Sequence, residues 1–296
     1  MNNFLSALTA RVIVLSVCFL LFVAPSAAQQ GQVYNQFFMN PYIYNPAYAG
    51  VDGHGVVFAM YKQQWSKIDD GPSFMHASYH MPLKGGIGFG VAGFRDTFGP
   101  LTTSAGKASA SYLVNIDRKH FLRLGMSLGM GTNQIILPED ASGDPAFAGS
   151  SSSHLIGEFG ATYHFDHFNI GFSMPNLFSS ELVNDDGSLS PINLKPTDRM
   201  LFKMNYRGHI NHEFAIEPHI LYRYSSVLPS QFEVATVVHV KHIAWVGATY
   251  RQDAGMVGLL GMKIKQKFAV GAAFELGNSD FNSLTGSTYE IHIGMH

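Results

Sequence analysis

Large apolar residues occupy every second position in several stretches of this chain, and this alternation constrains the fold more than any other feature. Between 121 and 130, Leu122, Leu124, Met126, Leu128 and Met130 alternate with Phe, Arg, Gly and Ser. Stretches 202–207, 214–223 and 268–276 follow the same rule. Successive side chains of a strand point to opposite faces. Each stretch is therefore predicted to be a strand with one apolar face and one polar or small-residue face.

The connections between these strands favour a membrane barrel over a soluble sandwich. We predict about fourteen strands, near 54–65, 72–82, 85–96, 103–115, 119–131, 155–165, 167–175, 198–210, 212–224, 229–240, 242–251, 255–265, 267–276 and 286–296. Every second connection is very short, and the others are longer, notably 132–154 and 176–197. Short turns at one end and longer loops at the other are typical of outer-membrane barrels. Residues 53–296 are therefore predicted to form an all-β fold, a transmembrane antiparallel β-barrel of about 14 strands, closed by pairing of its first and last strands.

The first residues predict export. The apolar run Val12–Val23 is followed by small residues up to Ala28, which is the pattern of a secretory signal peptide. The run is too short for a membrane-spanning helix, which needs about 20 apolar residues. We expect residues 1–28 to be removed, so that Gln29 begins the mature chain. The single cysteine, Cys18, lies in this segment, so the mature chain is expected to have no disulfide.

Composition agrees with a membrane β-barrel, which for an exported chain indicates the outer membrane. Charged residues make up 14% of the chain, against about 25% in a typical soluble domain. After the first 28 residues no stretch approaches the length of apolar residues that a spanning helix needs. The net charge of −2 gives no reason to expect binding to nucleic acid.

Residues 29–52 are predicted to form an N-terminal periplasmic segment that contains the motif Asn-Pro-Ala-Tyr-Ala-Gly. Asn-Pro pairs at 40–41 and 45–46 break regular strand pairing. Five aromatic side chains between 37 and 48 would be costly to expose. Two interpretations stay open: the segment packs at the periplasmic mouth of the barrel, or it is a surface that binds a partner. The candidate docking residues are Asn40, Pro41, Tyr44, Asn45, Pro46, Ala47, Tyr48 and Gly50.

No motif in the sequence predicts catalysis, a metal site or a cofactor. The fourteen histidines occur in loose pairs, and pairs four apart on a strand lie about 13 Å from each other. We expect them to face the lumen or the membrane interface. The Gly-rich stretch 85–90 lacks the following helix of a phosphate-binding loop. Nine charged residues on the polar faces are expected to line the lumen: Arg123, Glu158, Lys203, Arg207, Glu217, Arg223, Glu233, Arg251 and Lys263.

The stretch from Tyr34 to Gly50 resembles the N-terminal signature of the PorP/SprF family, outer-membrane proteins of the type IX secretion and gliding-motility machinery. Similar elements follow at Gln63-Gln64-Trp65 and at His80-Met81-Pro82-Leu83, and the resemblance spans essentially the whole mature chain. It implies a non-enzymatic barrel that supports secretion or surface attachment of large surface proteins. The partners it implies are outer-membrane lipids, periplasmic components of the machinery, and exported surface proteins or adhesins.

Two alternatives stay open at this stage. A general outer-membrane diffusion channel would have the same strands, and conductance in planar bilayers would identify it. An outer-membrane hydrolase would need a nucleophile, a histidine and an orienting group at one place. The segment Ser150–His154 is the nearest candidate, and hydrolysis assays after mutation of His154 would test it.

Overall fold

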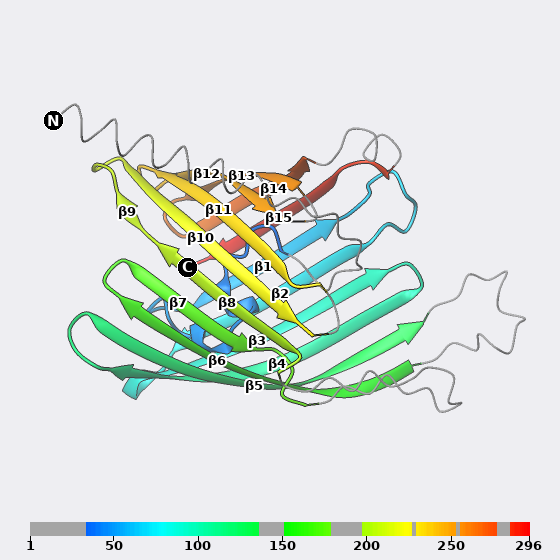
Figure 1. Cartoon of the computed structure of the whole chain (residues 1–296), viewed down its shortest axis with the longest axis horizontal. Helices are drawn as coiled ribbons and strands as arrows, with labels where there is room; N and C mark the ends of the chain where they lie inside the picture. The colour runs from blue at the N-terminus through cyan, green and yellow to red at the C-terminus, as the bar shows by residue number, and fades with distance from the viewer. Residues whose placement is uncertain (1–33, 136–150, 179–196, 227–228, 253–254, 277–284) are drawn as a thin grey trace, which may run out of the picture.

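The computed structural model describes residues 34–135, 151–178, 197–226, 229–252, 255–276 and 285–296, and they form a closed antiparallel β-barrel (Figure 1). Within these residues no helix is long and apolar enough to cross a membrane. The strands are β1 (Val56–Gln63), β2 (Ser73–Pro82), β3 (Ile87–Phe98), β4 (Leu101–Asn115), β5 (His120–Ile135), β6 (Ser151–Phe165), β7 (Phe168–Met174), β8 (Arg199–Tyr206), β9 (Gly208–His209), β10 (Phe214–Ser225), β11 (Gln231–Val240), β12 (Ala244–Arg251), β13 (Gly255–Ile264), β14 (Phe268–Leu276) and β15 (Thr288–Met295).

The barrel has fourteen strands, because β8 and β9 are two parts of one strand. Asn205 of β8 pairs with His219 of β10, and Gly208 of β9 pairs with Ile216 in the same register. Only Arg207 interrupts this strand. Each strand pairs with its sequence neighbours, and β1 pairs with β15 to close the ring. The predicted fold class, strand number and closure are confirmed.

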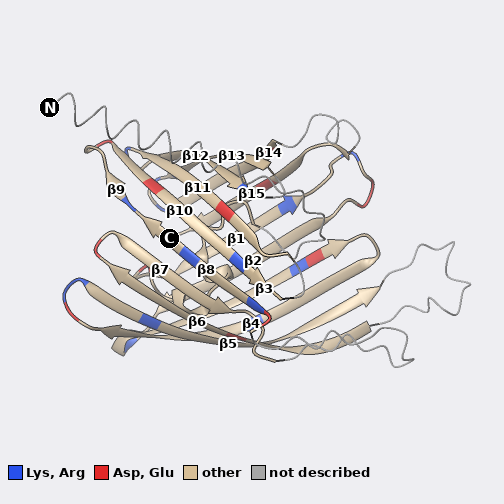
Figure 2. Cartoon of the chain, in the orientation of Figure 1, with Lys and Arg blue, Asp and Glu red and all other residues tan. Residues whose placement is uncertain are grey.

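Alternation along the strands separates a membrane-facing surface from a lumen. On β5, Leu128 and Met130 are 61% and 62% exposed, whereas Arg123 and Ser127 between the outward positions are buried. Of the nine charged residues expected in the lumen, Arg207 lies between β8 and β9, and the other eight lie on lumen-facing strand positions. In Figure 2 most of each strand is free of charge, with isolated blue and red positions. The apolar face can therefore meet hydrocarbon while the polar face stays inside.

The connections at the two ends of the barrel differ less in length than the sequence predicted. The turns β4–β5 and β6–β7 gather at one end, on the left of Figure 1. At the other end we expected a loop over 97–102, but β3 and β4 are joined by Gly99 and Pro100 alone, with Phe98 paired to Leu101. Gly99 has a φ of 55°, a conformation that glycine adopts without steric cost. β5 and β6 also extend into the predicted loop 132–154, and most of the loop predicted at 176–197 lies outside the described residues.

Residues 34–51 lie inside the barrel, and we call them the luminal plug. They contact inward-facing side chains of strands on opposite sides of the ring, including Ser78 of β2 and His219 of β10. The segment predicted as a separate periplasmic part over 29–52 is therefore placed differently: its described part lies in the lumen, where most of its aromatic side chains are buried, and a cavity of about 370 Å³ remains beside it. Residues 1–33, with the predicted signal peptide, lie outside the described residues.

The two-faced strands predict how charge is tolerated on the outer surface. Leu128→Arg puts a cation in the middle of the apolar face of β5 and should destabilise the barrel by about 2–4 kcal/mol. Gln134→Arg, an outward position near the end of the same strand, should cost about 0–1 kcal/mol. Reversible urea unfolding in lipid vesicles measures both values. Equal costs would show that β5 does not cross the bilayer in this way.

Candidate functional site

The backbone of the luminal plug is built from two short 3-10 turns, η1 (Pro41–Ile43) and η2 (Pro46–Tyr48). Each begins at the proline of an Asn-Pro pair, because proline has the φ of a helical first residue and lacks an N–H that would need a partner. Asn45 caps η2: its Oδ1 accepts a hydrogen bond of 2.9 Å from the Ala47 N–H. The Asn-Pro pairs thus prevent strand formation and fold the segment into a compact insert.

Glycines of the barrel wall form the seat of η2. A Cβ on Gly125 of β5 would lie 2.3 Å from the Ala47 nitrogen, and a Cβ on Gly160 of β6 would lie 1.9 Å from Asn45 Oδ1. Both distances are far below van der Waals contact. With glycine at these positions the Asn45 Nδ2 reaches the wall itself, where it donates to the backbone carbonyls of Ala161 and Phe172 at 3.2 and 3.0 Å. The motif therefore fits the backbone of β5, β6 and β7.

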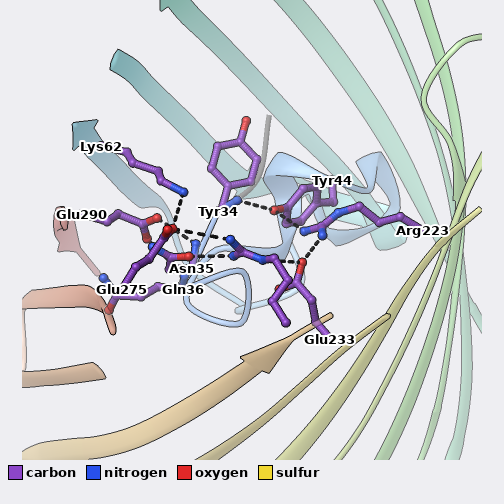
Figure 3. Close-up of polar contacts among 10 residues, drawn as sticks. Tyr34, Asn35, Gln36, Tyr44, Lys62, Arg223, Glu233, Glu275 and Glu290 are labelled. Carbon is purple, nitrogen blue, oxygen red and sulfur yellow. Dashed lines mark hydrogen bonds and ion pairs between the residues drawn. The ribbon is translucent and has the colours of Figure 1, made fainter. Parts of the chain in front are cut away.

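The start of the plug is held by a buried carboxylate. The two Glu290 oxygens accept hydrogen bonds from the backbone N–H groups of Asn35 and Gln36, at 2.7 and 3.1 Å (Figure 3). The Arg251 guanidinium donates to Asn35 Oδ1 at 2.6 Å. These donors and acceptors lie on residues far apart in the chain, so they form only when the barrel is closed around the plug.

A set of six charged lumen residues, which we call the charge latch, continues from this contact. Lys62, Arg223 and Arg251 are its cations, and Glu233, Glu275 and Glu290 are its anions. Lys62 pairs with Glu275 at 2.8 Å, and Arg251 lies 3.2 Å from Glu233 and 3.5 Å from Glu275. Arg223 also pairs with Glu233. With three charges of each sign the latch is neutral, as a buried set must be to avoid an uncompensated charge.

The latch also holds the middle of the plug. The Arg223 guanidinium donates to the Tyr44 hydroxyl at 3.1 Å, and the same oxygen accepts from the Tyr34 N–H at 3.0 Å (Figure 3). The Arg223 guanidinium carbon lies 5.4 Å from the centre of the Tyr44 ring. Tyr44 therefore joins the start and the middle of the plug to the wall at β10.

The remaining candidate docking residues also lie in the lumen. Asn40 donates to Ser78 Oγ at 2.8 Å, the Tyr48 hydroxyl donates to Asn169 Oδ1 at 2.8 Å, and the Gly50 N–H donates to His80 Nδ1 at 3.2 Å. Pro41 begins η1 and is half-buried, while Pro46 and Ala47 are buried in η2. Every one of the eight residues thus belongs to the plug, and its packing against the lumen wall is what the structure shows.

Burial keeps the plug tyrosines neutral. Desolvation raises the pKa of Tyr42 to about 12, although its hydrogen bond with Ser109 acts in the opposite direction. The pKa of Tyr48 is also raised, again chiefly by burial. The phenol groups therefore act as neutral hydrogen-bonding groups over the physiological pH range.

Several histidines pack against the plug, and they do not converge on one point. The Phe38 ring stacks on His219 at 5.1 Å, and Tyr42 lies 5.2 Å from His80. In the part of the chain that the structure describes, no group of three His, Cys, Asp or Glu side chains is placed to hold a metal ion. The side chains around the plug can bind and position a polypeptide segment, which is the chemistry that this site supports.

Sequence reasoning found the motif of the plug but missed most of its partners. Lys62, Glu275 and Glu290 were not among the predicted lumen charges, although alternation within their strands places all three on the polar face. Asn35 and Gln36 were not singled out either. The pairing of Asn35 with Glu290 joins residues 255 positions apart, and no local pattern in the sequence signals such a contact.

The solved structures that resemble this chain share little sequence with it. "CymD monoaromatic hydrocarbon channel" has a TM-score of 0.53 and 12% identity, and the match covers 90% of this chain and 93% of that one. The toluene transporter TodX of Pseudomonas putida has a TM-score of 0.49 and 13% identity, with 86% and 91% covered. Outer membrane protein Omp33 of Acinetobacter baumannii has a TM-score of 0.47 and 10% identity, with 82% and 97% covered. At this identity the first similarity shows the fold alone, and the other two add nothing to it.

The sequence itself identifies the family. No curated protein matches this chain. The model of the type IX secretion system membrane protein family PorP/SprF matches residues 26–295, which include the luminal plug and every strand. The barrel, the plug motif and this match over nearly the whole length lead to one conclusion: the chain belongs to the PorP/SprF family of type IX secretion system membrane proteins.

Proposed function

We propose that this protein is a non-enzymatic outer-membrane component of the type IX secretion and gliding machinery that supports secretion or surface attachment of large surface proteins. The observation that carries the proposal is the luminal plug, which is hydrogen-bonded to strands on opposite sides of the barrel in a chain of the PorP/SprF family. A barrel with an occupied lumen acts through its ends and its outer surface. Export by a cleaved signal peptide is part of this proposal.

We place the proposed docking site for periplasmic partners at the end of the plug. After Val51 the chain leads through exposed residues 52–55 directly into β1, next to the β2–β3 turn. Residues from Asn40 to Gly50 face the lumen wall, so they position this mouth of the barrel and the exposed stretch that follows them. Periplasmic components of the machinery are proposed to bind here, with the plug seated.

The hydrolase alternative has little geometric support. His154 lies in β6, and its Nδ1 has no hydrogen-bond partner within the described residues. A catalytic histidine needs a group that holds its ring in one orientation and tautomer. We therefore propose no catalytic residue for this chain.

The proposed orientation predicts a labelling pattern in intact cells. With the short turns in the periplasm, a cysteine at Ser151, exposed at the start of β6, should react with an impermeant maleimide. A cysteine at Lys241, in the exposed β11–β12 turn, should react only after the outer membrane is permeabilised. The mature chain is expected to have no native cysteine, so the background is low. The opposite pattern would reverse the orientation.

Because the plug packs against glycines of the barrel wall, we predict that the barrel is closed and that a larger side chain at one of these glycines opens it. Gly160→Val puts a side chain where Asn45 Oδ1 lies, so Asn45 and Pro46 have to move away from the wall, which should unseat the plug. The purified variant should give steady currents in planar bilayers where the unchanged protein gives none. Gly258→Val is the matched control, because a Cβ at Gly258 meets nothing within 4 Å. Large steady currents from the unchanged protein would favour the general diffusion channel instead.

The docking proposal predicts that unseating the plug impairs secretion. Replacing Tyr44 and Tyr48 with Ala removes their hydrogen bonds to Arg223 and Asn169, at about 1–3 kcal/mol each. Cells that carry the double variant should lose secretion or attachment of the surface protein, while the barrel still inserts and runs heat-modifiably. Tyr112→Ala, on the outward face of β4, is the control. Normal secretion by the double variant would remove the docking role.

A disulfide tests whether the seated plug is the working state. Cysteines at Asn40 and Ser78, whose side chains are hydrogen-bonded to each other, should lock the plug to β2 when a short bifunctional methanethiosulfonate joins them through reducible disulfides. Because partners are proposed to bind with the plug seated, the locked barrel should secrete normally. Loss of secretion that a reducing agent restores would show that the plug has to move, and would overturn this form of the proposal.

A further inference from the structure

The outer wall of the barrel carries an apolar groove of about 1280 Å³ that runs across β12 to β3. Its floor is widest where small outward residues lie side by side in the sheet. Ala59 pairs with Ala77, and Ala77 pairs with Gly93. Three adjacent strands thus have small side chains at the same level, and the surface is hollowed there.

The groove opens toward the membrane rather than toward the lumen. Leu260, Ile291 and Met75 border it and are 55%, 50% and 52% exposed, as outward residues of this barrel are. Trp245 and His292 also border it, but both are buried on lumen-facing positions, where their rings stack with centroids 5.9 Å apart. His76 and Phe94 are further lumen-facing residues at its border, but most of the residues that line the groove are on lipid-facing positions.

The groove differs from the rest of the described outer wall because it has a charged residue, Arg95, on an outward position. Across the described strands, every other Asp, Glu, Lys and Arg lies on a lumen-facing position, whereas Arg95 pairs with the outward residues Met75 and Ser104. Arg95 lies at the border of the groove. Within the described part of the chain its guanidinium has no hydrogen-bond or ion-pair partner.

The level of Arg95 is the edge of the apolar belt. The next outward row toward the long-loop end is polar on five adjacent strands: Gln63, Ser73, Thr97, Thr102 and Gln134. Outer-membrane barrels change from apolar to polar outward residues where hydrocarbon gives way to headgroups. A guanidinium at this level is within reach of headgroup phosphates, which it recognises with paired N–H donors.

We propose that this groove binds a phosphorylated membrane lipid, with acyl chains along the Ala59, Ala77 and Gly93 floor and a headgroup phosphate on Arg95. The apolar walls and the single cation match the two parts of such a lipid. A protein partner would meet a surface with one charged group, at its edge. In the orientation proposed above, the long-loop end lies in the outer leaflet, so the lipid is of the lipid A class; the labelling experiment tests that orientation independently.

Native mass spectrometry of the full-length barrel in mild detergent tests this site with two probes, lipid A and chemically dephosphorylated lipid A. The unchanged protein should retain lipid A about tenfold more strongly than the dephosphorylated form, which corresponds to about 1.4 kcal/mol. Arg95→Gln should remove this preference. Ala77→Leu, which fills the groove floor, should weaken binding of both probes.

Two matched variants control for nonspecific effects. Ala110→Leu adds the same bulk to an outward position of β4 outside the groove, and Arg118→Gln removes an exposed arginine at a turn. Both should bind lipid A as the unchanged protein does. Equal retention of the two probes by the unchanged protein, or an unaltered preference in Arg95→Gln, would overturn the proposal. A protein dimer that Ala77→Leu disrupts, without lipid retention, would assign the groove to a second copy of this chain.

Discussion

Pairing of β1 with β15 is the contact on which the rest of this structure depends. In hydrocarbon an unpaired strand edge leaves backbone donors and acceptors without partners, at a cost of several kcal/mol for each group. The ladder from Val57–Met295 to Gln63–Tyr289 removes both edges at once. This pairing also fixes which side chains of each strand point into the lumen, because a shift of one residue would turn every side chain of a strand to the other face. Lys62 and Glu290, which lie opposite each other on these two strands, face the lumen only in this register.

Closure in this register places charged side chains in the lumen, and the plug supplies hydrogen-bond partners for some of them. The charged side chains that cannot face lipid are gathered in the lumen, where many of them are buried. Buried ion pairs contribute little net stability, because desolvation costs offset the attraction between the charges. Loss of one partner is different, since it leaves a charge without compensation. The charge latch therefore contributes mainly to the position of the plug in the lumen. Glu290 accepts from the N–H groups of Asn35 and Gln36, and Arg251 donates to the Asn35 side chain, so a shift of the plug would break all three hydrogen bonds.

How much could be predicted from the sequence follows from the range of each interaction. Alternation is local, so strand number and the inward set of charges were predictable. The plug motif was recognisable too, but its place was not, because an aromatic, Pro-rich segment would be buried equally well at the barrel mouth or in the lumen. The seat at Gly125 and Gly160 depends on strands brought together by the fold. The Gly99-Pro100 turn was predicted to be longer because glycine and proline are common in loops as well as in tight turns.

Strand β3 shows how one stretch of chain serves both faces of the wall. Gly88 and Gly90 face inward, and a Cβ at either would collide with the plug, at Ala49 O and the Tyr42 ring respectively. Gly93, of the opposite parity, lies on the outward groove, where a Cβ would meet only ordinary contact. The two inward glycines are therefore required by the plug, whereas the outward one leaves space that no residue in the described part of the chain fills. On its inner face β3 lacks side chains where the plug packs against its backbone. On its outer face β3 lacks a side chain at Gly93, where we propose that a membrane lipid binds.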